Sequence, residues 1–208
     1  PAVLDTIATV GTDAAINGNW KFTRHNAIGA EKPDYRDASW ESVSLPHTWN
    51  GHDGQDGGND YYRGTGWYRR SLAIDSKFRG KNFYLKFDGA ASVTEAFVNG
   101  KIAGKHKGSF GAFCFDITSF IKTGQNNSIA VKVNNAKDST ISPLRGDFTI
   151  YGGIYRGVHL LVLDKLSISP LDDASPGVYA KQVRVNEKSA DLEITTKLLN
   201  GYDVQKAP

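Results

Sequence analysis

Polar and aromatic side chains gather in two separate stretches of the sequence. The first, NGHDGQDGGNDYY at residues 50–62, holds four Gly and three Asp between Gly51 and Asp60 and no aliphatic residue. The second, SPLRGDFTIYGGIYRGVHL at residues 142–160, also places an Asp beside aromatic residues and Gly. Carboxylates and amides bond sugar hydroxyls, aromatic faces cover the C–H patches of a sugar ring, and Gly lets the backbone approach closely. The two stretches therefore predict a sugar-binding surface.

Other interpretations of these stretches stay open. Asp53, Asp56 and Asp60 have the oxygen chemistry of a calcium cradle, although the closing Glu of an EF-hand loop is absent. The same Asp and Gly residues also suit a solvated turn. Tyr and Trp populate ordinary sandwich strands, and Gly152-Gly153 is compatible with a simple bend.

Common catalytic and metal-binding motifs are missing from the sequence. It has no GxSxG elbow and no HExxH pair, and the single cysteine, Cys114, excludes an internal disulfide and a paired-cysteine zinc site. The histidines lie in no recognised ligand spacing: His25, His47, His52, His106 and His159. His159 lies in an apolar segment and is interpreted as a structural residue. No carboxylate pair is marked out for glycoside hydrolysis, so we expect no metal, no cofactor and no complete catalytic site here.

Composition indicates a soluble globular protein with a small positive charge. Of the 208 residues, 39% are hydrophobic and 23% are charged, and the net charge is +3. Lys and Arg are scattered, which gives no reason to expect nucleic acid or a membrane as partner. No apolar stretch approaches the ~20 residues of a membrane span. The chain starts at Pro1 and has no Met, so we expect that the natural start has been removed and favour a periplasmic or secreted location.

Alternating apolar residues predict β-strands along most of the chain. In NFYLKFDG, the residues Phe83, Leu85 and Phe87 share one face. NSIAVKV at residues 127–133 alternates in the same way. RGVHLLVLDKL at residues 156–166 is apolar on both faces, which predicts a central strand.

Turn signals join these segments. Asn99-Gly100 predicts a type I′ hairpin turn, because both residues tolerate positive φ. DITSFIKTG at residues 116–124 predicts one short helical turn, capped by Asp116 or Thr118 and ended by Gly124. Many short strands at this spacing predict an all-β, antiparallel β-sandwich.

The sequence changes character at SISPLDDASPG, residues 167–177. Two Pro and an acidic pair there predict a connection between domains. Two further alternating segments follow, GVYAKQVRV and ADLEITTKLL. We therefore predict one domain over residues 1–168, and over residues 177–208 the opening strands of a second sandwich that these residues do not complete.

Several motifs occur together in a recognisable order. They are NGNWKF, DASWESVSLPHTWN, YYRGTGWYRR, the segment from LKFDGAASVTEAFVNG to NNSIAVKVNN, and GDFTIYGGIYRGVHLLV. Their combination over roughly residues 15–165 resembles the N-terminal sugar-binding domain of glycoside hydrolase family 2. That family includes β-galactosidases, β-glucuronidases and β-mannosidases, and the resemblance is strongest to a β-galactosidase.

The resemblance implies a galactose-binding-domain-like jelly roll, with an immunoglobulin-like sandwich beginning at residue 177. It also implies that a C-terminal (β/α)₈ barrel, outside these residues, carries the two glutamates of a retaining mechanism, so no catalytic residue is assigned here. The motif GDFTIYGGIYR matches Asp147 to an Asp that contacts the terminal sugar. Asn59 matches an Asn in the loop before the aromatic strand, and Asp60 is the neighbouring candidate.

Three functions follow from these observations. The first is a domain of an exo-glycosidase whose partners are a carbohydrate substrate and the barrel of the same protein. The second is a free-standing carbohydrate-binding module, and the third is a structural sandwich whose aromatic residues serve its core and a protein partner. In each case the uncompleted second sandwich would expose apolar surface, so we expect the chain to be prone to self-association.

Overall fold

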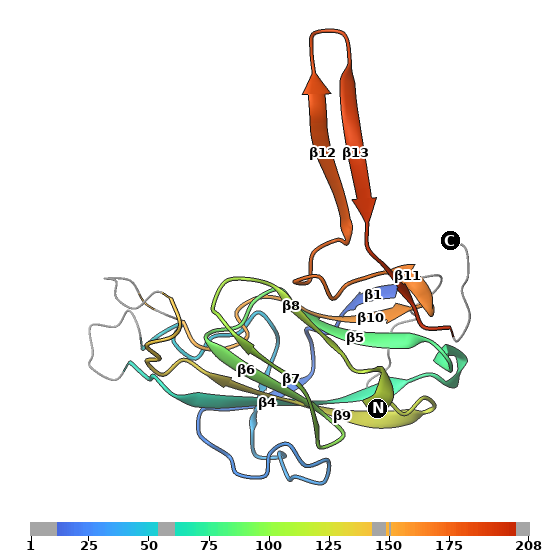
Figure 1. Cartoon of the computed structure of the whole chain (residues 1–208). Helices are drawn as coiled ribbons and strands as arrows, with labels where there is room; N and C mark the ends of the chain where they lie inside the picture. Colours follow the sequence, from blue (N-terminus) through green and yellow to red (C-terminus); the bar gives the residue numbers. More distant parts are fainter. Residues whose placement is uncertain (1–11, 54–60, 143–148, 150, 203–208) are drawn as a thin grey trace.

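Two antiparallel sheets pack face to face as a jelly-roll sandwich (Figure 1), which confirms the all-β prediction. The computed structural model describes residues 12–53, 61–142, 149 and 151–202. The six-stranded sheet has the order β3 (Glu41–Val43), β2 (Trp20–Thr23), β4 (Thr65–Ile74), β9 (Gln125–Asn134), β6 (Val93–Val98) and β7 (Lys101–Lys107). The four-stranded sheet has the order β1 (Thr12–Ala15), β10 (Val158–Leu163), β5 (Asn82–Phe87) and β8 (Phe113–Asp116). Within those described ranges, no helix is long and apolar enough to span a bilayer.

The core lies between the two sheets and follows the alternation of the sequence. From β5 it receives Phe83, Leu85 and Phe87, and from β9 it receives Ile129 and Val133, all at most 2% exposed. Burial of each such side chain contributes about 1.5–3 kcal/mol relative to exposure. Strand β10 lies between β1 and β5 in its sheet, as its apolar sequence predicts.

Strand β4 is buried on both faces, because a second apolar cluster covers the outside of its sheet. Its residue Tyr68 points into the main core, whereas Trp67 joins the outer cluster. The other members of the outer cluster are Ala27, Ala30, Trp40 and Ala130, with Tyr35 and Phe97 packed against them. Most of these residues come from the segment between β2 and β3, which lies below β4 and β9 in Figure 1.

Arg69 fastens the outer segment to the sheet. The residue is only 4% exposed, and its Nε donates to Asp37 Oδ2 at 2.8 Å. One terminal nitrogen donates to the carbonyls of Ala30 and Lys32, and the guanidinium lies over the Tyr35 ring. A buried guanidinium is tolerated only when its donors are paired, and here the partners come from the segment that it holds.

The predicted turns are present. Asn99 and Gly100 have φ of 51° and 80° in the hairpin between β6 and β7, as a type I′ turn requires. The expected helical turn is the 3₁₀ helix η2 (Thr118–Phe120), where Asp116 Oδ1 accepts from the Thr118 N–H at 2.9 Å. A second 3₁₀ turn, η1 (Ser76–Phe78), connects β4 to β5.

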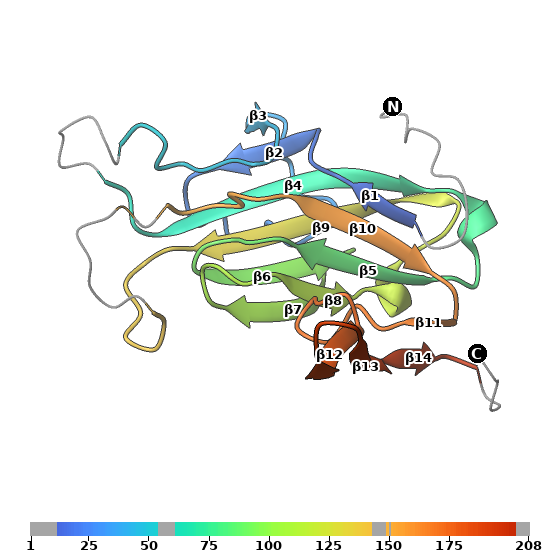
Figure 2. The same cartoon turned by 90° about the horizontal axis from the view of Figure 1, so that it is seen from above.

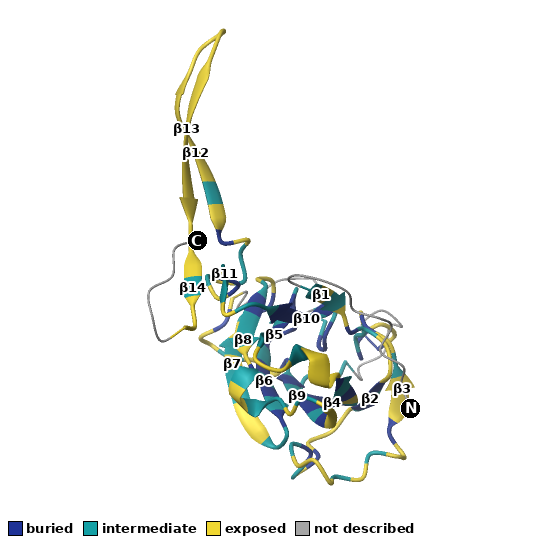
Figure 3. Ribbon diagram, turned by 90° about the vertical axis from the view of Figure 1, so that its right-hand side faces the viewer, coloured by how far each residue is buried: buried dark blue, intermediate teal, exposed yellow. Residues whose placement is uncertain are grey.

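A long hairpin projects from the sandwich at its C-terminal side (Figure 3). It consists of β12 (Val178–Val185) and β13 (Ala190–Thr196), and below it β11 (Leu166–Ile168) pairs with β14 (Leu198–Asn200). The register places Val185, Leu192 and Ile194 on one face of the hairpin, and these side chains are 57–62% exposed. The predicted pair of strands is confirmed, while the division into two domains stays a prediction.

We expect Arg69→Met to lower the free energy of unfolding by about 3 kcal/mol, because Asp37 and the carbonyls of Ala30 and Lys32 would each lose a hydrogen bond. Urea unfolding of the 208-residue chain measures this loss. Arg36→Met is the matched control, since Arg36 is exposed in the same segment and its replacement should change the free energy by less than about 0.5 kcal/mol. Equal effects from both replacements would contradict the fastening role of Arg69.

Candidate functional site

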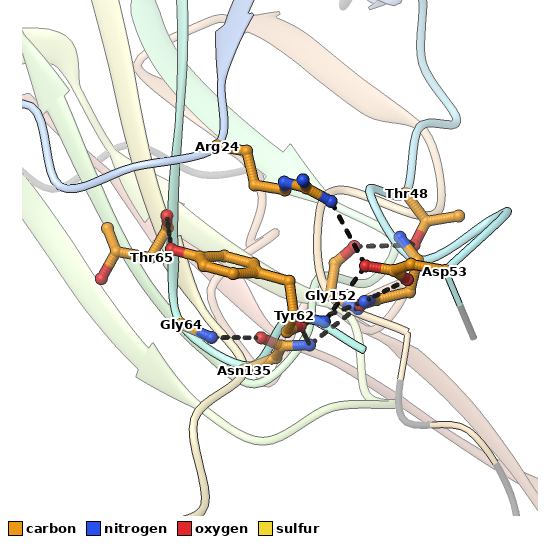
Figure 4. A network of polar contacts seen from close by, with 9 residues as sticks. Arg24, Thr48, Asp53, Tyr62, Gly64, Thr65, Asn135 and Gly152 are labelled. Atoms are coloured by element: carbon orange, nitrogen blue, oxygen red, sulfur yellow. Dashed lines mark hydrogen bonds and ion pairs between the residues drawn. The ribbon is translucent and has the colours of Figure 1, made fainter. Parts of the chain in front are cut away.

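Both stretches that predict sugar binding approach the same end of the sandwich. Asp53 and Tyr62 lie on either side of residues 54–60, and Asn135 and Gly152 lie on either side of residues 143–150. These four flanking residues belong to one network of polar contacts (Figure 4). Strand β4 begins from this end of the molecule and β9 ends there, at the left in Figures 1 and 2.

The centre of this network is Asn50, whose residue exposure is 0%. Its Oδ1 accepts from the Gly152 N–H at 2.8 Å and from Asn135 Nδ2 at 3.0 Å. Its Nδ2 donates to Asp53 Oδ1 at 2.9 Å and to the Tyr62 carbonyl at 3.0 Å. A side-chain amide offers two donor hydrogens and two acceptor lone pairs, so every hydrogen-bonding position of this amide is used.

Asp53 carries the buried negative charge of the network. The residue is 7% exposed, and its Oδ2 accepts from the Tyr62 N–H at 3.1 Å and from Arg24 at 3.3 Å. Arg24 is half exposed and its guanidinium also lies over the Tyr62 ring, 5.3 Å from the centroid. The carboxylate is thus paired with a charge and with neutral donors, which offsets the free energy of its desolvation.

Asn135 and Thr48 extend the network to the backbone of both stretches. Asn135 Oδ1 accepts from the Gly64 N–H at 2.9 Å, and the Asn135 carbonyl accepts from Arg63 Nε. Thr48 Oγ1 donates to the Gly152 carbonyl at 2.8 Å. Because Gly152 also donates its N–H to the buried amide, both of its backbone polar groups are fixed.

Gly152 and Gly153 are required by close packing. A Cβ on Gly152 would lie 2.2 Å from Trp49 and 2.5 Å from Asn135 Nδ2. Gly153 has φ of 121°, and a Cβ there would lie 2.6 Å from the Tyr68 hydroxyl. Interpreting this pair as a simple bend is therefore incomplete, since each Gly lets the backbone touch the side chains beneath it.

The aromatic residues of YYRGTGWYRR are largely structural. Trp67 and Tyr68 are 4% and 0% exposed and belong to the two apolar clusters. Tyr62 is partly buried, and its hydroxyl donates to the Thr65 carbonyl at 2.8 Å. The alternative of ordinary sandwich packing is confirmed for Trp67 and Tyr68.

Two of the histidines have structural partners. His47 Nδ1 lies 2.8 Å from the Tyr68 hydroxyl, and burial lowers the pKa of His47 despite an opposing influence from Glu41. His159 bridges two carboxylates, with Nδ1 2.6 Å from Asp13 Oδ1 and Nε2 3.0 Å from Asp88 Oδ2. The structural interpretation of His159 is confirmed.

The two residues assigned by resemblance, Asn59 and Asp147, lie outside the described residues, as does Asp60. Their sugar-contacting roles stay predictions. The structure instead brings together the residues that flank them.

A calcium cradle receives no support from the one candidate ligand that is described. Both oxygens of the Asp53 carboxylate are engaged by protein donors, and Asp56 and Asp60 lie outside the described residues. Over the part of the chain that is described, no three His, Cys, Asp or Glu side chains form a group able to hold a metal.

Sequence reasoning missed Asn50 and Asn135. Asn50 precedes Gly51 and has the local signature of an exposed turn. Asn134 and Asn135 follow directly after the alternating apolar residues of β9. No local pattern separates a buried, four-bonded Asn from a turn Asn, because the bonding partners come from residues up to 102 positions away.

The sandwich superposes on domains of solved glycoside hydrolase structures. Residues 14–164 match the family described as "Glycosyl hydrolases family 2, sugar binding domain". The chain belongs to this family.

Relatives are considerably longer than this chain. A β-glucuronidase of Bacteroides fragilis is 43% identical over 188 residues, which cover 90% of this chain and 26% of that protein. A β-galactosidase of Thermoanaerobacter pseudethanolicus is 33% identical, covering 88% of this chain and 24% of that protein. The crystal structure of a Bacteroides uniformis β-glucuronidase superposes with a TM-score of 0.86 at 36% identity, covering 90% of this chain and 22% of its own.

We expect Gly152→Ala to lower the free energy of unfolding by about 2–3 kcal/mol, because the new methyl group would overlap Trp49 and Asn135. Urea unfolding measures this change. Gly111→Ala is the matched control, since no atom lies within 4 Å of its Cβ position. A stable Gly152→Ala variant would show that the packing at this end is looser than described.

The lowered pKa of His47 predicts that acid destabilises the fold. Between the ordinary His pKa of 6.5 and the lower folded value, the unfolded chain binds more protons, so the free energy of unfolding falls as pH falls from about 7 to 5. His47→Gln should reduce this slope, and a smaller slope remains from His106, whose pKa burial also lowers. Urea unfolding at several pH values measures the slope, and an equal slope in both proteins would contradict the prediction.

Proposed function

We propose that this chain supplies the substrate-contacting sandwich of a family 2 exo-glycosidase that hydrolyses terminal glycosidic bonds of oligosaccharides. The family match over residues 14–164 is the observation that carries the proposal. The catalytic groups of such an enzyme would lie outside these 208 residues, since the chain spans about a quarter of the relatives that it matches. The loop-end network supports a contact role, because it anchors both stretches with sugar-binding chemistry at one place.

The sugar that we propose first is a β-glucuronide. The Bacteroides fragilis relative, at 43% identity, bears the name β-glucuronidase, and the Bacteroides uniformis structure bears it at 36%. A β-galactoside is the second candidate, favoured by the relative named β-galactosidase at 33% identity and by the match of GDFTIYGGIYR to the β-galactosidase motif.

The test uses the complete protein with 4-nitrophenyl β-D-glucuronide and 4-nitrophenyl β-D-galactoside as substrates. We expect kcat/KM for the glucuronide to exceed that for the galactoside at least tenfold. The reverse ratio would establish the second candidate, and no hydrolysis of either would contradict both.

Asp147→Ala tests the assigned sugar contact in the same protein. A charged acceptor bonded to a sugar hydroxyl is worth about 1.5–3 kcal/mol, so we expect kcat/KM to fall about tenfold or more. If Asp147 only caps the following turn, thermal stability should fall while kcat/KM stays unchanged.

Calorimetry on the 208-residue chain separates the enzyme domain from a free-standing binding module. A domain that forms only part of a sugar pocket should bind galactose, glucuronate or longer glycans at millimolar affinity or not at all. Micromolar binding by this chain alone would instead favour the binding module.

A further inference from the structure

The amide of Asn50 joins stretches of chain that are otherwise far apart in sequence. Its partners Asp53 and Tyr62 lie within the first predicted sugar-binding stretch. Gly152 lies within the second stretch, and Asn135 lies shortly before it. One side chain therefore fixes the distance between the ends of both stretches.

The chemistry at this position admits only an amide of this length. A carboxylate at position 50 has no hydrogen to donate to the Tyr62 carbonyl, and it would place a second negative charge about where Nδ2 now lies, 2.9 Å from Asp53 Oδ1. An apolar side chain would remove one hydrogen bond from each of the four partners. The network is thus sensitive to a change of one atom.

The four bonding partners of this amide all lie outside the strands of the sandwich. The main apolar cluster is centred on β4, β5, β9 and β10, and the ten-residue ladder between β4 and β9 runs away from the network. Hydrogen bonds that served only the stability of the sandwich would not have to connect these loops to one another. The location of the network therefore indicates that it positions the two loops.

We propose that Asn50 is a positioning residue, which holds the two sugar-contacting stretches at the separation that the substrate requires. This inference rests on the proposed glycosidase function. Asn50 does not touch the sugar, and it acts through the backbone of Tyr62 and Gly152 and through the Asp53 carboxylate.

The first experiment compares Asn50→Asp, Asp53→Asn and the double variant in the complete protein. Each single variant leaves like groups facing each other, either two carboxylates or two amide nitrogens. The double variant exchanges the two groups, so that the new amide at position 53 would donate to the new carboxylate at position 50, while the amide oxygen accepts from the Tyr62 N–H and from Arg24. Asn126→Asp is the control, because it makes the same chemical change at an exposed position of β9.

We expect Asn50→Asp to lower kcat/KM for the better aryl glycoside at least tenfold, mainly through KM, at temperatures where circular dichroism shows a folded protein. The double variant should recover part of this loss, because it removes the facing pair of carboxylates but does not restore the donor to the Tyr62 carbonyl. Asn126→Asp should match the wild type. A folded Asn50→Asp variant with kcat/KM within twofold of the wild type would overturn the proposal.

If Asn50→Asp does not fold, Arg24→Gln decides, because it weakens the network from its solvent side while the core stays intact. We expect a loss in kcat/KM of about threefold or more, with little change in melting temperature. An unchanged kcat/KM would overturn the proposal.

A second experiment needs no enzymatic activity and so separates failure of this inference from failure of the proposed function. Site-resolved amide exchange of the 208-residue chain follows the N–H groups of Tyr62 and Gly152 against that of Val131 in the β9 ladder. Asn50→Asp should speed exchange at Tyr62 and Gly152 at least tenfold and leave Val131 unchanged. Equal acceleration at all three would show a general loss of stability and overturn the positioning role. An inactive wild-type protein with the expected exchange pattern would instead refute only the glycosidase function.

Discussion

The loop end of this sandwich depends on the pairing of polar groups that water does not reach. Asn50 is completely buried, and its amide can remain there only because four partners satisfy it. Asp53 is subject to the same constraint and resolves it with Arg24 and two neutral donors. Since the partners come from three separate parts of the chain, satisfying one side chain determines where all three parts lie. Any of these buried groups left unpaired would destabilise the folded state, so the hydrogen bonds hold this end of the molecule in one arrangement.

Strand β4 packs against the core on one face and against the segment between β2 and β3 on the other. Tyr68 faces the main core while Trp67 and Arg69 face outward, where the segment between β2 and β3 covers them. The strand is therefore apolar and aromatic on both faces, although only one face meets the other sheet. Burial on two sides explains why two aromatic residues, Trp67 and Tyr68, are adjacent in this strand.

The sequence predicts the fold well where the signal is local. Period-two alternation identifies β5 and β9, and the run that is apolar on both faces identifies β10. Asn99-Gly100 identifies the hairpin turn. These features depend on neighbouring residues alone. The combination of motifs predicts the family, which the match over residues 14–164 confirms. The buried network around Asn50 and Asn135 could not be predicted, since its partners are brought together only by the completed sandwich. For the same reason Asp53, expected in a polar loop, is instead a buried partner of Arg24.

The residue after Asn50 is a glycine, and Asn-Gly is the dipeptide in which asparagine loses ammonia most readily. That reaction requires the Gly51 nitrogen to attack the Asn50 side-chain carbon while the amide nitrogen departs. The four hydrogen bonds on this amide hold it away from free rotation, so chemical ageing at this position is slowed by the same contacts that order the loops. Loss of ammonia would give a cyclic imide, which water would open to an aspartate or to an isoaspartate with a lengthened backbone, at the centre of the network. The fraction of molecules changed in this way would therefore increase with the time that this end of the protein spends open.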